Sequence, residues 1–345
     1  MNIRNTIATY PLLTIFTNTG KKSFSNMAKH INVSDNTISR ILRPGKESLL
    51  ACKDIAKSIF RKQKTLMVVI DETTIKKQYA QLMEGTGFHF DTKTNSCNNA
   101  YKLMVSAITD GKHTVPIDAA FTFGKEFYEN SSTAREVAVN FYIKNAQALF
   151  SNTRIIAALD GAFASVNYLK WCLANAIASV VRMHSNRTVE YKGKKQKIRE
   201  IKELRPKGRQ MFRTISVIWQ GLPLYITAVR RIDRHGCETI VYQASTFLAL
   251  PKKHAQAYKN RWGIEKLFRS AKQTLGLQEC FSRKIKTQFD HTCAVLLAYA
   301  ITQQQMKNGY YKNPESVARA LEKQKQHILL KGISSLDQIF GNIYA

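Results

Sequence analysis

The chain has few acidic residues for its length. Its 345 residues include 24 Asp and Glu against 53 Lys and Arg, so the formal net charge at pH 7 is +29. This excess indicates a polyanionic partner. The basic residues are spread over several segments and not gathered on one amphipathic helix, so nucleic acid is favoured over a membrane surface. A passive binder of the ribosomal kind would carry the same charge and stays open.

The chain also lacks cysteine pairs at redox or metal-binding spacing. Its six cysteines are scattered, without any Cys-x2-Cys motif, and this argues against zinc and favours buried thiols in a reducing cytoplasm. No apolar run reaches the ~18 residues of a membrane span, and the run YPLLTIF (10–16) is too short and too poorly flanked for a signal peptide. We expect a cytoplasmic protein with no membrane partner.

Near the N-terminus, residues 23–42 predict two short helices about a turn. Ser34 is the expected N-cap of the second helix. That helix would present polar residues outward, including Arg40, and such residues contact phosphates and base edges from a helix-turn-helix. An ordinary helical hairpin is the alternative, but the basic surroundings favour DNA binding. A basic connecting helix is expected over 49–62.

Two apolar segments each lead directly into an aspartate. Residues 65–70 lead into Asp71, and residues 154–159 lead into Asp160. A buried strand that delivers a carboxylate at its C-terminal end is a recurrent way to place a catalytic or metal-binding group. Taken alone, Asp71 could instead belong to a strand-end turn.

The segments around these aspartates predict an α/β order with a mixed sheet. We expect a strand hairpin about Asp110-Gly111, then a helix, a second helix after Asp160 and a further strand. These elements span 101–109, 114–123, 132–150, 163–174 and 178–183. An apolar helix over 289–304 would cover the sheet.

From residue 185 to 250 the pattern becomes basic and rich in β-branched residues, which predicts a β-rich insertion suited to a phosphate backbone. Trp219, Tyr225 and Phe212 are candidates for stacking on a displaced base, although an aromatic in an apolar run is more often core. The chain then divides into a helical DNA-binding region (1–64), a core in two parts (65–184 and 251–305), the insertion (185–250) and a helical tail (306–345).

A helix expected over 257–275 carries a polar stripe. At roughly 100° per residue, Tyr258, Arg261, Glu265 and Lys272 fall within about 60° of one another. A surface helix with an ordinary Arg261/Glu265 ion pair is the simpler interpretation. Asp71 and Asp160 change that weight, because three carboxylates make an oxygen-only set that suits Mg²⁺ or Mn²⁺. Two such ions promote in-line phosphoryl displacement.

The spacing Tyr258-x2-Arg261-x3-Glu265-x6-Lys272 resembles the Y-R-E-K signature of DDE transposases from bacterial insertion sequences, the IS-four family. The segments VIDETT, AITDGKHTVPI, ALDGAFAS and SVVRMHSNR are similar to that family as well, so the resemblance covers about residues 65–305.

This resemblance implies a ribonuclease-H-like core with a β-strand insertion, in which Asp71, Asp160 and Glu265 bind two divalent ions. It implies a dimer on paired element ends of double-stranded DNA, with cleavage followed by strand transfer of 3′-hydroxyls. Tyr258, Arg261 and Lys272 would contact DNA near the cleaved phosphate. A catalytically silent, domesticated DNA-binding protein and a two-metal nuclease without strand transfer remain alternatives.

Overall fold

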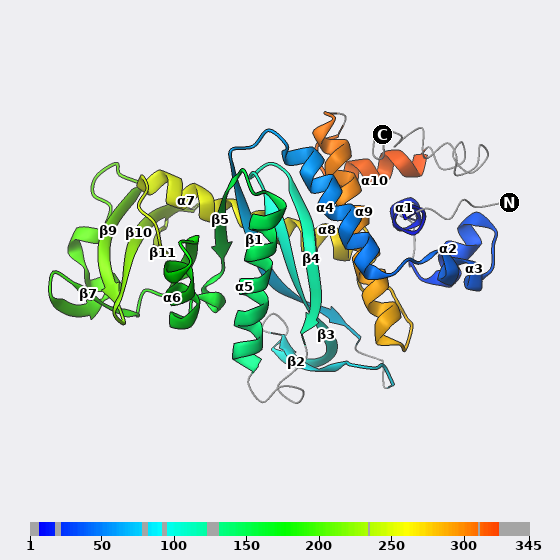
Figure 1. Ribbon diagram of the computed structural model, residues 1–345, viewed down its shortest axis with the longest axis horizontal. Coiled ribbons are helices and arrows are strands. Elements are labelled where there is room, and N and C mark those ends of the chain that lie inside the picture. Colours follow the sequence, from blue (N-terminus) through cyan, green and yellow to red (C-terminus); the bar gives the residue numbers. More distant parts are fainter. Residues whose placement is uncertain are drawn as a thin grey trace.

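One large sheet, surrounded by helices, organises the chain (Figure 1). The computed structural model describes residues 7–17, 22–77, 82–91, 95–122, 131–233, 235–309 and 311–323. In this part the strands follow the order β2-β3-β1-β5-β6-β11-β10-β9-β7-β8, and β4 pairs with β3. The protein is therefore a mixed α/β protein, as the element order predicts.

The strands fall into two groups on this sheet. The core strands are β1 (Thr65–Lys76), β2 (Gly87–Asp91), β3 (Ser96–Thr109), β4 (Thr114–Thr122), β5 (Arg154–Leu159) and β6 (Ala178–Met183). The insertion strands are β7 (Thr188–Tyr191), β8 (Lys194–Lys197), β9 (Phe212–Trp219), β10 (Leu222–Ile232) and β11 (Glu238–Ser245). Among the pairs of described strands, β1/β5 and β5/β6 are parallel and the others antiparallel.

The β-rich insertion is confirmed, but it is not detached from the core sheet. Strand β11 pairs antiparallel with β6, so the insertion extends the same sheet. The hairpin about Asp110-Gly111 is also confirmed, with Thr109 opposite Thr114. Strand β2 was not predicted from the sequence.

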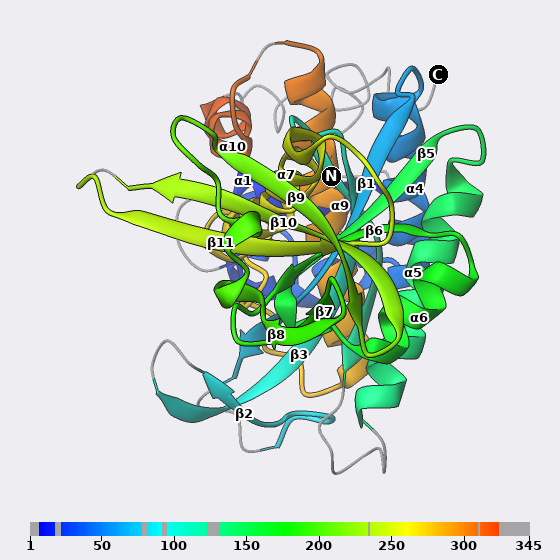
Figure 2. The ribbon, with the colours of Figure 1, turned by 90° about the vertical axis from the view of Figure 1, so that its left-hand side faces the viewer.

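The helices cover both faces of the sheet. They are α1 (Thr9–Phe16), α2 (Phe24–Ile31), α3 (Asp35–Ile41), α4 (Gly45–Phe60), α5 (Ser131–Leu149), α6 (Val166–Ala174), α7 (Pro251–Asn260), α8 (Trp262–Gln273), α9 (Ile285–Lys307) and α10 (Pro314–Lys323), with 3₁₀ turns η2 (Gly161–Phe163), η3 (Ile198–Glu200) and η4 (Lys202–Leu204). Helices α5 and α6 lie on one side of the parallel strands (Figure 2). Each precedes a parallel strand, as right-handed crossovers require.

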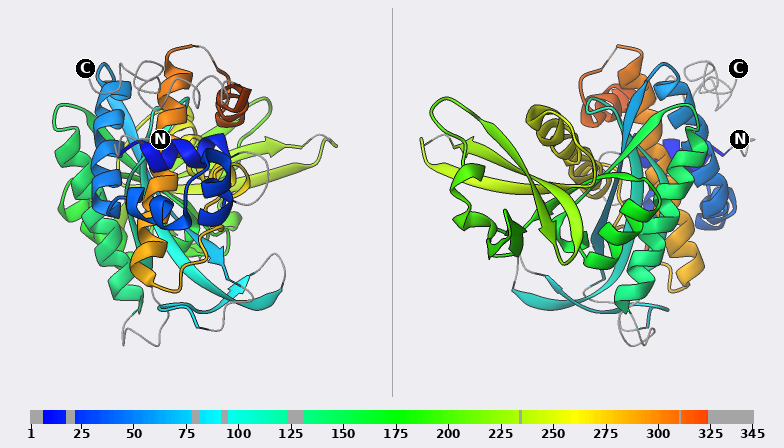
Figure 3. Two further views of the ribbon diagram at one scale, coloured as in Figure 1. Left: turned by 90° about the vertical axis from the view of Figure 1, so that its right-hand side faces the viewer. Right: turned by 60° about the vertical axis from the view of Figure 1, so that its left-hand side comes forward.

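The two N-terminal helices predicted over 23–42 are confirmed as α2 and α3. Ser34 caps α3 by accepting a hydrogen bond from the Thr37 N–H at 3.3 Å, and Arg40 is exposed in the last turn of α3. The two helices share a small apolar core with α1 and with Ala294 of α9. Figure 3 shows this blue N-terminal group beside the orange α9.

Helix α4 differs from the basic connecting helix expected over 49–62. It begins at Gly45 and buries an apolar face, including Cys52 and Ile55, against α9 and β4. The tight contact of Gly45 with α9 explains the early start, because a Cβ at Gly45 would lie 2.9 Å from Cys293 Sγ. The apolar helix over 289–304 is confirmed within α9.

The cysteines follow the prediction only in part. Four are buried, whereas Cys97 and Cys237 are exposed, so buried thiols were wrongly expected at these two positions. No described helix combines the length and apolar character that crossing a membrane requires. Of the helical tail expected over 306–345, α10 is described, and residues 324–345 lie outside the described part of the chain.

Candidate active site

Asp71 and Asp160 lie side by side on neighbouring parallel strands. The last parallel pair joins Ile70 of β1 to Leu159 of β5, and each aspartate is the next residue. Asp160 follows the end of β5, as predicted. Asp71 does not end its strand, because β1 continues to Lys76 in antiparallel pairing with β3. The expectation of a strand end at Asp71 was therefore wrong, although the two carboxylates still meet at one level of the sheet.

Glu265 lies on α8, and the single helix expected over 257–275 is in fact two. Helix α7 ends at Asn260, α8 begins at Trp262, and Arg261 joins them with φ −53° and ψ −29°. The junction packs tightly on the β3–β4 hairpin. A Cβ at Gly263 would overlap Thr114 Oγ1, and a Cβ at Gly111 would lie 2.7 Å from Asn260 Oδ1. The junction between α7 and α8 is therefore in close contact with this hairpin.

Two residues of this junction connect all three carboxylates. The Tyr258 hydroxyl donates to Asp160 Oδ1 at 3.2 Å. The Arg261 guanidinium donates through Nη1 to Asp71 Oδ2 at 3.3 Å and through Nη2 to Glu265 Oε1. Three residues of the predicted polar stripe, Tyr258, Arg261 and Glu265, thus lie in one cluster with the two strand aspartates, as a catalytic rather than a surface role requires.

The charges in this cluster act on one another. Burial raises the pKa of Asp71 to about 6; the Glu72 N–H and Arg261 oppose this rise, whereas the charges of Asp160 and Glu265 add to it. Burial likewise raises the pKa of Tyr258 to about 12, so its hydroxyl stays protonated and donates. Burial alone would lower the pKa of Arg261, but the surrounding anions hold it above its ordinary value.

The donor set suits a hard divalent cation. All three acidic side chains offer carboxylate oxygens, the ligands that Mg²⁺ and Mn²⁺ prefer. Among the described residues, however, no three His, Cys, Asp or Glu side chains are grouped so that they could hold an ion. Arg261 explains this spacing, because its guanidinium lies between Asp71 and Glu265. The chemistry of the residues fits divalent cations, whereas their present arrangement favours the guanidinium.

The other three candidate DNA contacts lie on α8, α3 and β9. Lys272 is half-buried in the last turn of α8. Arg40 lies on α3, in the N-terminal helix pair. Trp219 is only 2% exposed, with the Arg187 guanidinium 5.7 Å from its ring centre. In this conformation the ring of Trp219 belongs to the core, and a base could stack on it only after a rearrangement.

Glu72, which lies beside Asp71, was not predicted as a residue of the site. Its carboxylate is 10% exposed and pairs with Lys102 and Arg135, each at 2.8 Å. The acidic pair Asp71-Glu72 in a strand was a signal, because strand alternation places such neighbours on opposite faces of the sheet. The partner Arg135 could not be found in this way, because it comes from a helix far along the chain.

Of three comparisons with known proteins, one identifies a family. A family model described as a transposase DDE domain matches residues 62–301. Among curated proteins, no match was found. Among solved structures, the crystal structure of the NurA nuclease from Sulfolobus solfataricus is similar over 66% of this chain and 82% of that chain, at 12% identity and a TM-score of 0.29. That likeness is too weak to carry an argument, so the family match alone bears on function.

Proposed function

Because this chain belongs to the family of transposases with a DDE domain, a family of DNA-cleaving enzymes, we propose that Asp71, Asp160 and Glu265 are its catalytic carboxylates. One observation supports this most directly. Tyr258 and Arg261 lie close together at the junction of α7 and α8, and between them they contact all three carboxylates. A surface ion pair would not draw together side chains from two strands and a helix.

The proposed core is ribonuclease-H-like, with residues 185–250 as its insertion. Two carboxylates on neighbouring parallel strands, with a third on a helix that packs on β1, support this assignment. The division of the chain into a DNA-binding region, a two-part core and a tail stays a prediction. Assignment to the IS-four family rests on the Y-R-E-K spacing and on the four similar segments of the sequence.

The proposed cofactors are two Mg²⁺ or Mn²⁺ ions held by Asp71, Asp160 and Glu265. Bound there, divalent ions supply an activated water and stabilise the leaving oxygen of the phosphodiester. Without bound ions, Arg261 pairs with Asp71 and Glu265 and offsets part of their charge. Tyr258 fixes the orientation of Asp160, since its hydroxyl remains a donor.

The proposed substrate is double-stranded DNA, first at the ends of the element and then at a target. Tyr258, Arg261 and Lys272 would contact the backbone near the cleaved phosphate, and Arg40 would contact DNA from α3. A homodimer would hold paired ends. The high net charge of +29 supports a backbone-binding role over much of the surface.

A plasmid that carries this gene with its flanking DNA tests the proposal. With Mg²⁺, the protein is expected to nick this plasmid near the ends of the element, and Asp160→Ala is expected to abolish nicking. Undiminished nicking by Asp160→Ala would contradict the assignment. Incubation of a pre-cleaved 3′-hydroxyl end with a second plasmid tests strand transfer, because a nuclease of the same fold would yield no joined product.

A further inference from the structure

Asp71 is oriented by the residue that follows it. The backbone N–H of Glu72 donates to Asp71 Oδ1 at 2.8 Å, while Arg261 takes the other carboxylate oxygen. The Glu72 side chain points to the opposite face of β1, where its carboxylate accepts hydrogen bonds from Arg135 Nη2 and an ion pair from Lys102 Nζ, both at 2.8 Å. A displacement of Glu72 would therefore be passed directly to the Asp71 carboxylate.

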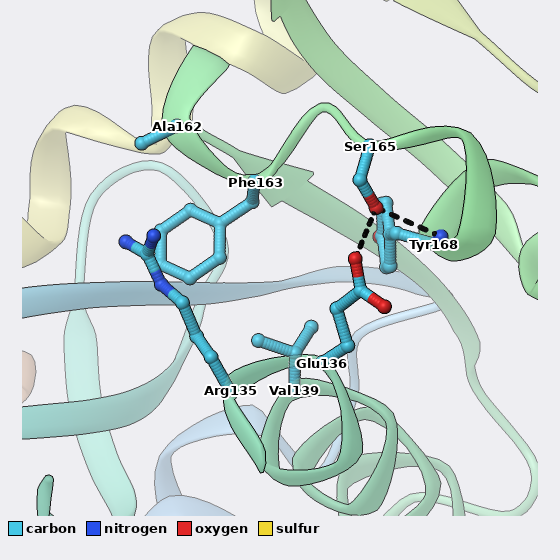
Figure 4. A pocket seen from close by; sticks show the side chains of 7 residues that line it. All are labelled: Arg135, Glu136, Val139, Ala162, Phe163, Ser165 and Tyr168. Atoms are coloured by element: carbon cyan, nitrogen blue, oxygen red, sulfur yellow. Dashed lines mark hydrogen bonds between the residues drawn. The ribbon is translucent and has the colours of Figure 1, made fainter. Parts of the chain in front are cut away.

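Arg135 also touches the segment that follows Asp160. Its guanidinium carbon lies 4.3 Å from the centre of the Phe163 ring, a cation–π distance. Phe163 ends the turn η2, and its N–H donates to the backbone oxygen of Asp160 at 3.0 Å. Figure 4 shows the guanidinium beside the face of the Phe163 ring. Arg135 thus bridges the two segments that carry the strand aspartates.

The contacts with Glu72 and Phe163 determine the position of the Arg135 side chain. A cavity of about 170 Å³ opens beside it, lined in part by Phe163, Val139 and Tyr168 (Figure 4). Arg135 Nε is buried and has no hydrogen-bond partner among the residues that the structure describes. The next residue, Glu136, accepts a hydrogen bond from Ser165 Oγ at 2.6 Å, so the helix itself is anchored separately to the start of α6. Loss of the Arg135 side chain would then loosen the bridge without releasing α5.

We propose that Arg135 is a positioning residue that sets the separation of the Asp71 and Asp160 carboxylates, through Glu72 on one side and Phe163 on the other. This inference rests on the proposed catalytic role of the two aspartates. In this proposal Glu72 is the residue of β1 that binds Arg135, and Lys102 offsets the remaining charge of the Glu72 carboxylate.

The chain offers a matched control for this bridge. Lys144 of α5 lies 5.8 Å from the ring centre of Trp171 in α6, so it is a second cation–π contact of α5, made with the helix that follows η2. Neither residue is adjacent to a carboxylate of the site. Lys144 is exposed, whereas Arg135 also pairs with the carboxylate of Glu72, so the two variants can differ in stability. A purely structural role of Arg135 would lower the melting temperature of Arg135→Gln but leave the nicking rate of the folded variant equal to that of Lys144→Gln.

The experiment compares Arg135→Gln, Arg135→Lys, Phe163→Leu and Lys144→Gln in single-turnover nicking of the plasmid described above. Because a shift of about 1 Å in a reacting group can cost about 100-fold in rate, we expect Arg135→Gln to slow nicking by about 10- to 100-fold and to raise the Mg²⁺ concentration for half-maximal rate. DNA affinity, measured by gel shift, should stay within about twofold. Arg135→Lys keeps the ion pair with Glu72 and should recover part of the rate.

The outcomes separate this inference from the proposed function. Thermal melting of each variant shows whether it folds, and Phe163→Leu tests the bridge from its other side if Arg135→Gln does not fold. Nicking by Arg135→Gln and Phe163→Leu at the rate of Lys144→Gln would overturn the positioning role, while Asp160→Ala still abolished cleavage. Absence of nicking by the unsubstituted protein would overturn the proposed function and this inference with it.

Discussion

The two ends of α8 both depend on buried cations, but the partners of those cations differ. At the N-terminal end, Arg261 is 8% exposed and pairs with the carboxylates of Asp71 and Glu265. Beyond the C-terminal end, Lys22 is 3% exposed and donates through Nζ to the backbone oxygens of Thr14 and Thr274. One end therefore neutralises charge, and the other binds neutral acceptors.

A second buried lysine makes the C-terminal end firmer still. Lys77 Nζ donates to the backbone oxygens of Gln278 at 3.0 Å and Cys280 at 2.5 Å. Burial lowers the pKa of Lys22 and of Lys77 to about 8 in each case, and the charge of Glu279 opposes only part of this shift. Burying such lysines costs free energy. Their hydrogen bonds to Thr274, Gln278 and Cys280 offset part of that cost and fix the segment after α8.

His291 completes this anchor in its neutral form. Burial lowers the pKa of His291 to about 4, so the ring has one N–H, which its Nε2 donates to the backbone oxygen of Gly276 at 3.0 Å. Its Nδ1 then accepts from the Tyr10 hydroxyl at 2.7 Å. Gly276 has φ +77°, and a Cβ there would lie 2.7 Å from Lys22 Cδ. The N-terminal end of α8 is thus held by ion pairs between side chains, whereas hydrogen bonds to backbone oxygens hold the segment beyond its C-terminal end.

The largest expected effect on the nicking rate comes from a substitution at the N-terminal end of α8. Glu265→Gln keeps an oxygen for Arg261 but removes a charge, so nicking should fall by about 10³-fold or more, while thermal stability and DNA binding change little. Glu315→Gln is the control, because Glu315 also contacts α8, accepting from Ser270 Oγ at 2.6 Å. A Glu265→Gln variant that still cuts would return Arg261/Glu265 to an ordinary ion pair.

A substitution beyond the C-terminal end of α8 should instead lower the stability of the protein. Lys22→Met leaves two buried backbone oxygens without their donor, and we expect the free energy of unfolding to fall by about 3 kcal/mol. Denaturant titration measures this loss, with Lys29→Met on the exposed side of α2 as the control. The comparison of the two ends would fail if Lys22→Met slowed nicking as much as Glu265→Gln while its stability was unchanged.

The junction between the two helices should show an intermediate effect. Gly263→Ala places a Cβ against Thr114 Oγ1, and such overpacking costs about 1–3 kcal/mol. Part of that loss, and of the accompanying loss in nicking rate, should return in the double variant with Thr114→Ala. Chemical denaturation of both single variants and the double variant gives the coupling; additive losses would show that this contact does not seat the junction.

The smallest effect is expected at Tyr258. Tyr258→Phe removes one hydrogen bond to Asp160 and leaves the ring in place, so about 1 kcal/mol of orientation is lost, or about fivefold in nicking rate. Tyr311→Phe, on the partly buried Tyr311 that packs against the core after α9, is the control. If Tyr258 acted on DNA affinity alone, the loss would disappear at saturating DNA.

Local sequence patterns predicted most elements of this fold. Apolar runs predicted the parallel strands β1, β5 and β6, the Asp110-Gly111 turn predicted the β3–β4 hairpin, and Ser34 predicted the start of α3. The spacing of the polar stripe selected Glu265 as the partner of two strand aspartates, and the family match confirms a DDE transposase. These signals lie within a few residues of one another, which is why periodicity and capping reveal them.

Only the tertiary structure decided how those parts meet. Strand β1 continues past Asp71 because β3 is long enough to pair with it as far as Lys76. The helix breaks at Arg261, next to the close contact of Gly263 with Thr114 of another strand. Arg261 between two carboxylates and Arg135 beneath them follow from the same cause: contacts between distant segments depend on how elements pack, and no local pattern carries that information. The sequence by itself determined which carboxylates to consider, and packing determined what holds them together.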